Sequence, residues 1–404
     1  MKAESWGLLA TLLAFASCQQ ETVAPKYTIS AETRERLQLD DFYQKRVEVE
    51  GFSIVASENV SDHALEEAAF IIRKMVGHRT DLLTAMDASK TRLAIMGRGE
   101  FTTDLPEHAH LRPALYWNRR ARGLGADPDS PTPCVSCGEE NLIGLEGDPY
   151  STENILIHEF AHALHQMGIA KLDPGFQEAL EKIYENAISK GLWRGTYAAT
   201  NPAEYWAEGV QSWFGTNRED DHDHNHVNTR KELKEYDSDL ADLIKGVFGD
   251  REWTYLKPQD RKPPSPHMKG LNLDKEKPFR WPDKVLDWYD RFERGLVSLA
   301  PEGTPEISPM AEDSNTTRHS IKSSRKTTFY LRNLSSRPVR VDWIDFEGKP
   351  IRYAELRHKD QRQFSSFSSH LWQIADPETN STLARYLLPD ANASQVNLRK
   401  ESLP

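Results

Sequence analysis

Two histidines and a glutamate occur together in the apolar stretch Ile155–His165, in the pattern His-Glu-x-x-His. In an α-helix, residues four positions apart lie on one face, so His158 and His162 can present both imidazoles to one metal ion. Glu159 lies beside them and can reach a water molecule bound to that ion. Two fixed ligands, an open coordination position and a carboxylate base are what a zinc hydrolase needs. The motif therefore predicts a hydrolytic site with one Zn²⁺ ion.

A third protein ligand must complete this site. One pattern of zinc peptidases has a third histidine six residues after the second, but Gly168 occupies that position here. A carboxylate from a later helix is the alternative, and Glu204 and Glu208 share one face of a predicted helix over 201–214. Glu204 also lies three residues after Asn201, where a glutamate can instead complete a capping box. The residues alone leave both glutamates as candidates.

Other elements must hold these residues in place. The motif helix is expected to begin at Ser151 or Thr152, either of which can cap it, and to end at Gly168. The pattern predicts further helices over 176–189, 201–214 and 231–247, strands over 47–55 and 91–97, and a loop over the Pro-, Asp- and Gly-rich stretch 123–138.

Three further features have plain structural interpretations. Cys134 and Cys137 form a single pair, which cannot complete a four-sulfur metal site, so a local disulfide after export is the simpler expectation. The acidic, His-rich stretch 219–226 is expected to be a flexible loop, because ligands in a coil are not preorganised. His165 lies one turn beyond the zinc pair and is expected to pack or to support it.

The segments around the motif resemble a known family. His158-Glu-Phe-Ala-His162, together with Tyr197 seven residues before Glu204-Tyr-Trp-Ala-Glu208, resembles the catalytic domain of the anthrax lethal factor family of zinc peptidases. The resemblance implies that Glu204 is the third zinc ligand and that Tyr197 stabilises the transition state. It also implies that Glu208 hydrogen-bonds a ligand imidazole. The strand over 92–96 could then be the edge strand that holds peptide substrates.

The C-terminal part of the chain has a different pattern. Residues 301–324 are rich in Pro, Ser, Thr, Glu and Gly and are predicted to be a linker. After them the hydrophobic period changes from about 3.6 to 2, which is typical of strands. Residues 325–396 are therefore expected to form a small all-β domain.

This domain resembles the β domain of the von Hippel–Lindau tumour suppressor family. The similarity is dense from Trp343 to Tyr353 and from Ser366 to Trp372. In that family a Trp, Tyr, Ser, His and Trp recognise 4-hydroxyproline, and all five residue types are retained here. The implied substrate-docking pocket consists of Trp343, Tyr353, Ser366, His370 and Trp372. Filling of a small β-sandwich core by these aromatic residues is the alternative interpretation.

The N-terminus is typical of an export signal. Lys2 precedes a short apolar run and small residues end it, so residues 1–18 are expected to be a signal peptide and 19–26 a tether. Plain secretion is favoured, with lipid attachment at Cys18 as the alternative. A net charge of −11 without a basic stripe argues against nucleic acid as the main partner. The rest of the sequence lacks a transmembrane stretch.

Together these observations predict an α+β, zincin-like metallopeptidase domain over 27–300, a linker and an all-β sandwich domain. The expected function is a secreted zinc-dependent endopeptidase of the HExxH, gluzincin-like type. Its partners would be protein or peptide substrates, such as hydroxyproline-rich extracellular proteins. The alternative is a secreted binding protein with an inactive zincin domain, in which the β domain binds hydroxyproline or another partner.

Overall fold

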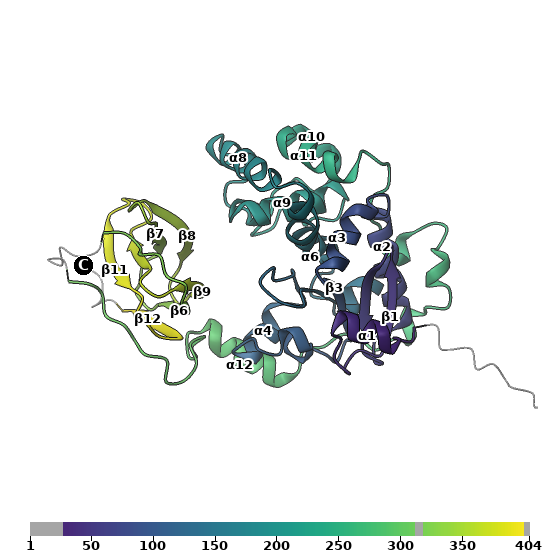
Figure 1. Ribbon diagram of the computed structural model, residues 1–404, viewed down its shortest axis with the longest axis horizontal. Helices are drawn as coiled ribbons and strands as arrows, with labels where there is room; N and C mark the ends of the chain where they lie inside the picture. Colours follow the sequence, from purple (N-terminus) through teal and green to yellow (C-terminus); the bar gives the residue numbers. More distant parts are fainter. Residues whose placement is uncertain (1–26, 312–317, 400–404) are drawn as a thin grey trace, which may run out of the picture.

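The structure is a computed structural model that describes residues 27–311 and 318–399. It contains an N-terminal α+β region and a C-terminal region resembling a β-sandwich (Figure 1). The predicted signal peptide, the tether and Cys18 lie outside the described residues. Within the described ranges, every helix is too short or too polar to cross a membrane.

The N-terminal region is built on a five-stranded sheet of order β1-β2-β3-β5-β4. β1 and β2 form an antiparallel hairpin, β3 and β5 continue the sheet in parallel, and the short β4 pairs antiparallel with β5 at the edge. The strands are β1 Lys45–Val49, β2 Phe52–Ala56, β3 Arg92–Met96, β4 Gly123–Leu124 and β5 Cys134–Gly138.

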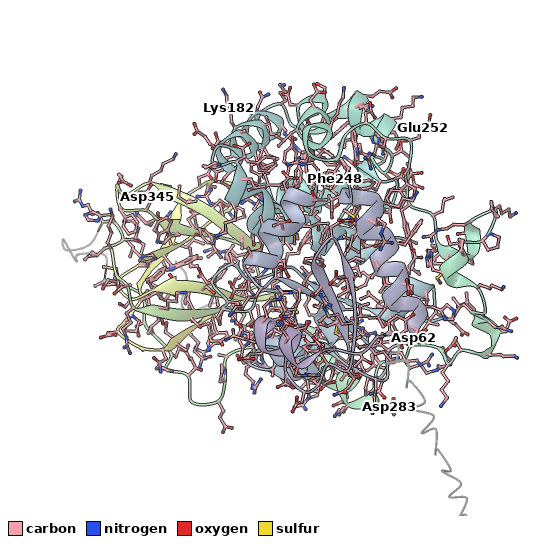
Figure 2. All side chains as sticks on the ribbon, turned by 45° about the vertical axis from the view of Figure 1, so that its right-hand side comes forward. Asp62, Lys182, Phe248, Glu252, Asp283 and Asp345 are labelled. Carbon is pink, nitrogen blue, oxygen red and sulfur yellow. The ribbon has the colours of Figure 1, made fainter. Side chains whose placement is uncertain are left out.

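Helices cover both faces of this sheet. A large apolar core joins Ile54 and Val135 of the sheet to Phe160 of α6, and a smaller one joins Leu37 of α1 to Ala94 on the opposite face. Figure 2 marks the start of α2 at Asp62 and the end of α11 at Phe248. The helices are α1 Ala31–Leu37, α2 Asp62–Val76, α3 Thr80–Ala88, α4 Ala114–Arg120, α5 Glu139–Ile143, α6 Ile155–Ala163, α7 Ala170–Leu172, α8 Phe176–Ser189, α9 Pro202–Trp213, α10 Arg230–Tyr236, α11 Ser238–Phe248 and α12 Asp283–Glu293.

The motif helix differs from its prediction at both ends. Asn154, rather than Ser151 or Thr152, caps α6, and its side chain accepts a hydrogen bond from the Ile157 amide over 3.0 Å. The chain does not leave the helix at Gly168. It continues through a π-helical turn, Leu164–Ile169, into α7.

Gly168 lies where this turn contacts α3. A Cβ placed on it would be 3.5 Å from the carbonyl oxygen of Leu82 and from Cγ of Met86, which is ordinary van der Waals contact. The helix therefore continues, packed against α3, through a residue that sequence alone suggests as its end.

The other predicted helices are largely confirmed. Helices over 176–189 and 201–214 appear as α8 and α9, with Asn201 as the cap of α9. The predicted helix over 231–247 is instead two helices, because Asp237 interrupts it. The Asp237 side chain accepts a hydrogen bond from the Leu240 amide over 3.2 Å and starts α11.

The loop predicted over 123–138 is shorter than expected, because its first two residues form β4, and the predicted disulfide is wrong. Its last five residues form β5, a buried strand inside the sheet. Residues an odd number apart on a strand point to opposite faces. Cys134 accordingly lies in the smaller core and Cys137 in the larger one, and both are free, buried thiols. Burial raises the pKa of each thiol.

The C-terminal region pairs a four-stranded sheet, order β11-β10-β7-β8, with a three-stranded sheet, order β12-β6-β9. Phe329, Val341 and Ile374 lie in the apolar core between them. The period-2 segments are confirmed as strands. They are β6 Lys326–Asn333, β7 Val339–Ile344, β8 Pro350–Leu356, β9 Gln361–Phe367, β10 Leu371–Ala375, β11 Thr382–Leu387 and β12 Ala393–Leu398.

The segment predicted as a linker is not a free spacer where the structure describes it. The amides of Ile307 and Met310 donate hydrogen bonds to the carbonyl oxygens of Gln395 and Arg385, over 2.9 and 2.8 Å. The amide of Ser320 donates to the carbonyl of Asp345 over 3.0 Å. Pro- and Ser-rich composition signals a lack of core side chains, but the backbone can still pair with the edge strands β11 and β12.

Candidate functional site

The two helices α6 and α9 carry the predicted site. Asn201 accepts hydrogen bonds from the amides of Ala203 and Glu204, over 2.9 and 3.0 Å, and so fixes the first turn of α9. The indole of Trp206 donates a hydrogen bond to the carbonyl of Ala161 over 2.9 Å. This contact joins α9 to α6 within one turn of each motif.

Three predicted ligand atoms converge between these helices. Nε2 of His158, Nε2 of His162 and Oε2 of Glu204 form a triangle in which each pair of atoms is 3.2 Å apart. Glu204 turns towards the histidines and makes no capping box with Asn201. In the described chain, this is the one group of three such side chains compact enough to hold a metal ion.

The dimensions and the charge of this triangle fit a zinc ion. Tetrahedral Zn²⁺ with bonds of about 2.0–2.1 Å separates its ligand atoms by about 3.3 Å. Burial opposes the charged forms of Glu204 and His158. The hydrogen bonds and charges of the neighbouring side chains together outweigh burial, so the pKa of Glu204 is lowered and the pKa of His158 is raised. The cluster thus favours a positive charge at its centre, which is what a cation supplies.

A glutamine that sequence reasoning missed supports the first histidine. Nδ1 of His158 lies 2.8 Å from Oε1 of Gln211, whose amide nitrogen donates to Glu153 over 3.0 Å. Glu208, predicted to hydrogen-bond a ligand imidazole, is farther from the same nitrogen, at 3.5 Å. Gln211 is seven residues after Glu204, which is two helical turns along the same face. This spacing is the sequence signal that could have placed Gln211 near the ligand histidines.

Glu208 instead anchors the His-rich loop. Its Oε2 lies 3.2 Å from Nε2 of His224, which is 7% exposed, and accepts a hydrogen bond from Asn217 over 3.0 Å. Asp221 accepts from the amide of His224 over 2.9 Å. The stretch 219–226, expected to be a flexible acidic loop, is irregular, and the buried contact between His224 and Glu208 attaches it to α9.

This loop also holds the predicted tyrosine. The carbonyl of Asp223 accepts a hydrogen bond from the amide of Tyr197 over 2.7 Å. The hydroxyl of Tyr197 donates to Oε1 of Glu204 over 3.2 Å, so the side chain lies at the ligand cluster. Burial raises the pKa of Tyr197, and the hydroxyl stays protonated and able to donate.

Glu159 lies against the edge strand β4. A Cβ placed on Gly123 would be 3.0 Å from Cγ of Glu159, and one on Gly125 would be 3.2 Å from Cβ of His162. Burial raises the pKa of Glu159, which suits a group that must accept and return a proton. The strand over 92–96, expected at the edge, is β3 inside the sheet. β4 is the edge strand beside the site.

His165 is a packing residue. It is buried, and its ring lies 5.2 Å from that of Phe176 and 6.2 Å from that of Trp206, centroid to centroid. Burial lowers the pKa of His165 to about 4, so the imidazole is neutral near pH 7.

The five predicted docking residues of the β domain also come together. Trp343 and Trp372 are cross-strand partners on β7 and β10. The indole of Trp372 donates to Oγ of Ser366 over 3.1 Å, and that oxygen lies 3.3 Å from Nδ1 of His370. The rings of Trp343 and His370 are 5.2 Å apart, and those of Tyr353 and Trp372 are 4.9 Å apart.

This group is only partly a core. Trp372 is 1% exposed, whereas Tyr353 is 49% exposed at the edge strand β8. The buried indole nitrogen of Trp343 has no hydrogen-bond partner among the described residues. A buried donor without an acceptor is costly, and a ligand oxygen would satisfy it.

Comparisons with known proteins give a match for the C-terminal region alone. The chain has no match among curated proteins. Residues 318–388 match the family model of the VHL beta domain, and this stretch of the chain contains all five predicted docking residues.

Proposed function

We propose that the protein is a secreted zinc-dependent endopeptidase of the zincin type, in which the β domain docks hydroxyproline-containing substrates. The proposal depends first on the 3.2 Å triangle of His158 Nε2, His162 Nε2 and Glu204 Oε2. Glu159 and Tyr197 flank this triangle, and both have the chemistry that peptide hydrolysis needs.

A zinc ion held by these three residues would lower the pKa of a bound water molecule and polarise a carbonyl group. The carboxylate of Glu159 accepts the proton of the attacking water and returns it to the leaving amine. The hydroxyl of Tyr197 donates a hydrogen bond to the oxygen on which negative charge develops. β4 is the edge strand beside Glu159, along which an extended substrate can add as a further strand.

Measurements of metal content and of peptide cleavage together test the proposed peptidase activity. The purified protein should contain one zinc ion per chain and cleave a peptide library, and chelation should abolish cleavage. Glu159→Gln should keep the zinc ion and lose turnover, because it removes the base and no ligand. Glu178→Gln, on the exposed face of α8, is the matched control and should remain active. If Glu159→Gln cleaves at the unaltered rate, the mechanism is wrong.

The pocket of the β domain supports docking of 4-hydroxyproline. Its aromatic faces suit an apolar pyrrolidine ring, while Ser366, His370 and the unpartnered indole nitrogen of Trp343 can pair with a hydroxyl group. A site built to pair a hydroxyl disfavours plain proline, because its polar groups then remain unsatisfied.

Binding to the inactive Glu159→Gln protein tests docking without cleavage. A hydroxyproline peptide should bind about 10- to 100-fold more tightly than its proline counterpart, since an unsatisfied buried polar group costs about 1–3 kcal/mol. Trp343→Ala should remove the preference, and Arg385→Ala on β11, outside the pocket, should retain it. Equal affinity for both peptides would contradict the docking role and leave the peptidase proposal standing.

A further inference from the structure

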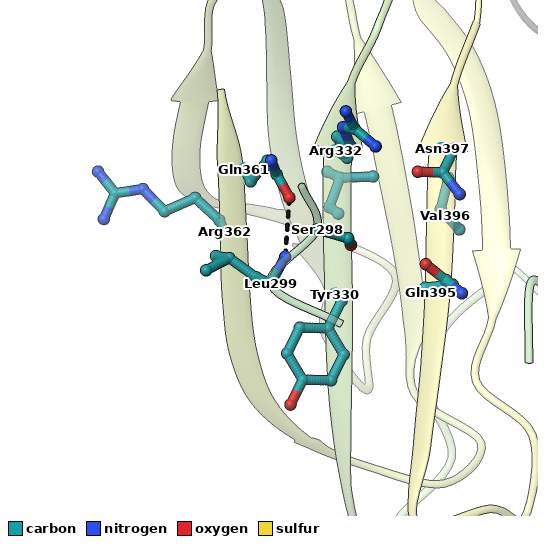
Figure 3. Close-up of a pocket in the computed structure, with 10 residues that line it drawn as sticks. Ser298, Leu299, Tyr330, Arg332, Gln361, Arg362, Gln395, Val396 and Asn397 are labelled. Carbon is teal, nitrogen blue, oxygen red and sulfur yellow. Dashed lines mark hydrogen bonds between the residues drawn. The ribbon is translucent and has the colours of Figure 1, made fainter. Parts of the chain in front are cut away.

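The β domain is attached to the N-terminal region through a packed joint. Ser298 and Leu299, which follow α12, lie on the three-stranded sheet of the β domain (Figure 3). The amide of Leu299 donates to Oε1 of Gln361 over 3.0 Å, and the amide nitrogen of Gln361 donates to the carbonyl of Val297 over 2.8 Å. The guanidinium of Arg332 donates to the carbonyl of Gly295.

Apolar side chains from both regions bury this joint. Leu299 and Tyr330 are 3% and 8% exposed, and they pack with Tyr116 of α4 and with Trp288 and Phe292 of α12. The paired hydrogen bonds and packed aromatic rings resist both rotation and separation of the β domain relative to the N-terminal region. A polar, flexible linker would resist neither. α4 leads directly into β4, the strand beside Glu159. The joint therefore connects the β domain to the wall of the catalytic site.

Two further contacts join the β domain to the N-terminal region. Nζ of Lys326 pairs with Asp129 over 3.1 Å, in the segment that follows β4. Nη1 of Arg357 lies 3.5 Å from Nε2 of His222, in the loop that holds Tyr197. These exposed contacts contribute little stability. They do place the start of β6 beside the segment that follows β4, and the end of β8 beside the loop that contacts Tyr197.

Two of the predicted docking residues are on strands of this same side. Tyr353 on β8 and Ser366 on β9 belong to edge strands, one from each sheet. In Figure 1, β8 and β9 lie on the side of the β domain that faces α6, α8 and α9. The edge strands that carry Tyr353 and Ser366 therefore lie on the side of the β domain nearest the helices α6 and α9, which carry the predicted metal ligands.

We propose that the β domain is a fixed-distance docking site, and that one extended polypeptide occupies the pocket and the metal centre of the same molecule. This inference depends on the proposed function. An extended chain advances about 3.3 Å per residue, so a rigid span between two sites corresponds to a set number of residues. Only a substrate in which the distance between the docked residue and the scissile bond equals that span can bind at the pocket and the metal centre at once, and so gain affinity from both.

A peptide series with a moving 4-hydroxyproline tests the spacing. The hydroxyproline shifts one residue at a time along an otherwise constant sequence, and mass spectrometry identifies the cleaved bond. The cleaved bond should shift in step with the hydroxyproline. If cleavage stays at one bond set by local sequence, the fixed spacing is overturned while the peptidase remains. If the zinc-loaded protein cleaves no peptide, the proposed function itself has failed.

Cross-linking supplies a readout that needs no turnover. The same peptides carry a photoreactive residue and bind to the full-length Glu159→Gln protein. At one spacing from the hydroxyproline, cross-links should map to 123–129, the segment that includes β4. Cross-links confined to the β domain at every spacing would overturn the inference.

Loosening the joint provides the matched comparison. Insertion of a four-residue Gly/Ser segment between Gly295 and Leu296 should spread cleavage over several bonds and retain hydroxyproline-peptide binding. The same insertion between Glu378 and Thr379, in the exposed turn between β10 and β11, should leave the spacing sharp. Unchanged spacing in the Gly295 insertion would contradict the role of the joint.

Discussion

The hydroxyl of Tyr197 donates a hydrogen bond to Oε1 of Glu204 over 3.2 Å, while Oε2 of the same carboxylate faces both histidines. One carboxylate thus sets the place of the tyrosine relative to the metal-ligand cluster. The amide of Tyr197 is held separately by Asp223, over 2.7 Å. The hydroxyl is therefore already held beside His158, His162 and Glu204 in the absence of substrate.

Tyr197→Phe should lower kcat with little change in zinc content. Loss of one preorganised donor to a developing oxyanion typically costs about 10²- to 10³-fold in rate. Phe keeps the ring and its contact with His158. Steady-state kinetics with metal analysis checks this prediction. A matched Tyr184→Phe change, which removes a hydroxyl bonded to the carbonyl of Ala199, should affect kcat far less.

Gln211→Ala should weaken zinc binding by about 10- to 100-fold, the usual effect of removing a hydrogen-bond partner of a metal-ligating imidazole. The physical reason is that Nδ1 of His158 loses its acceptor and the ring loses its fixed orientation. Competition with a zinc chelator measures the affinity. Gln177→Ala, exposed on α8, is the control. An unaltered affinity in Gln211→Ala would refute the supporting role.

Gly123→Ala should reduce activity, because the added Cβ would lie 2.8 Å from Cγ1 of Ile155 and 3.0 Å from Cγ of Glu159. Either the edge strand or the base must then move. Gly99→Ala meets no atom within 4 Å and should be neutral. Comparing kcat/KM and the melting temperature of the two variants separates a displaced base from general destabilisation. Equal activity would mean that the strand has room to shift.

Cys134 and Cys137 should remain unpaired thiols in the purified protein. They lie on opposite faces of β5, in different cores, so no rotation of their side chains brings the sulfur atoms together. Alkylation without reductant should modify both residues after unfolding and neither in the native state. Peptide mapping by mass spectrometry reads the result. A Cys134–Cys137 disulfide in the native protein would contradict the strand.

The sequence alone predicted the contacts that depend on local geometry. His158, Glu159 and His162 share a helix, so their relation follows from 3.6 residues per turn whatever surrounds them. Asn201 caps α9 for the same local reason, and strand alternation marked the β domain. The family resemblance selected Glu204 over Glu208, a choice that spacing within one helix left open.

Only the tertiary structure decided the relations between elements. The packing of α9 on α6 brought Glu204 to the histidines, gave Gln211 to His158 and left Glu208 to hold His224. Strand order put β4, rather than β3, at the edge beside Glu159. Backbone hydrogen bonds to β11 and β12 hold the described part of the segment that was expected to be a free linker. These contacts join residues far apart in the chain, and long-range packing, which no local period encodes, determines them.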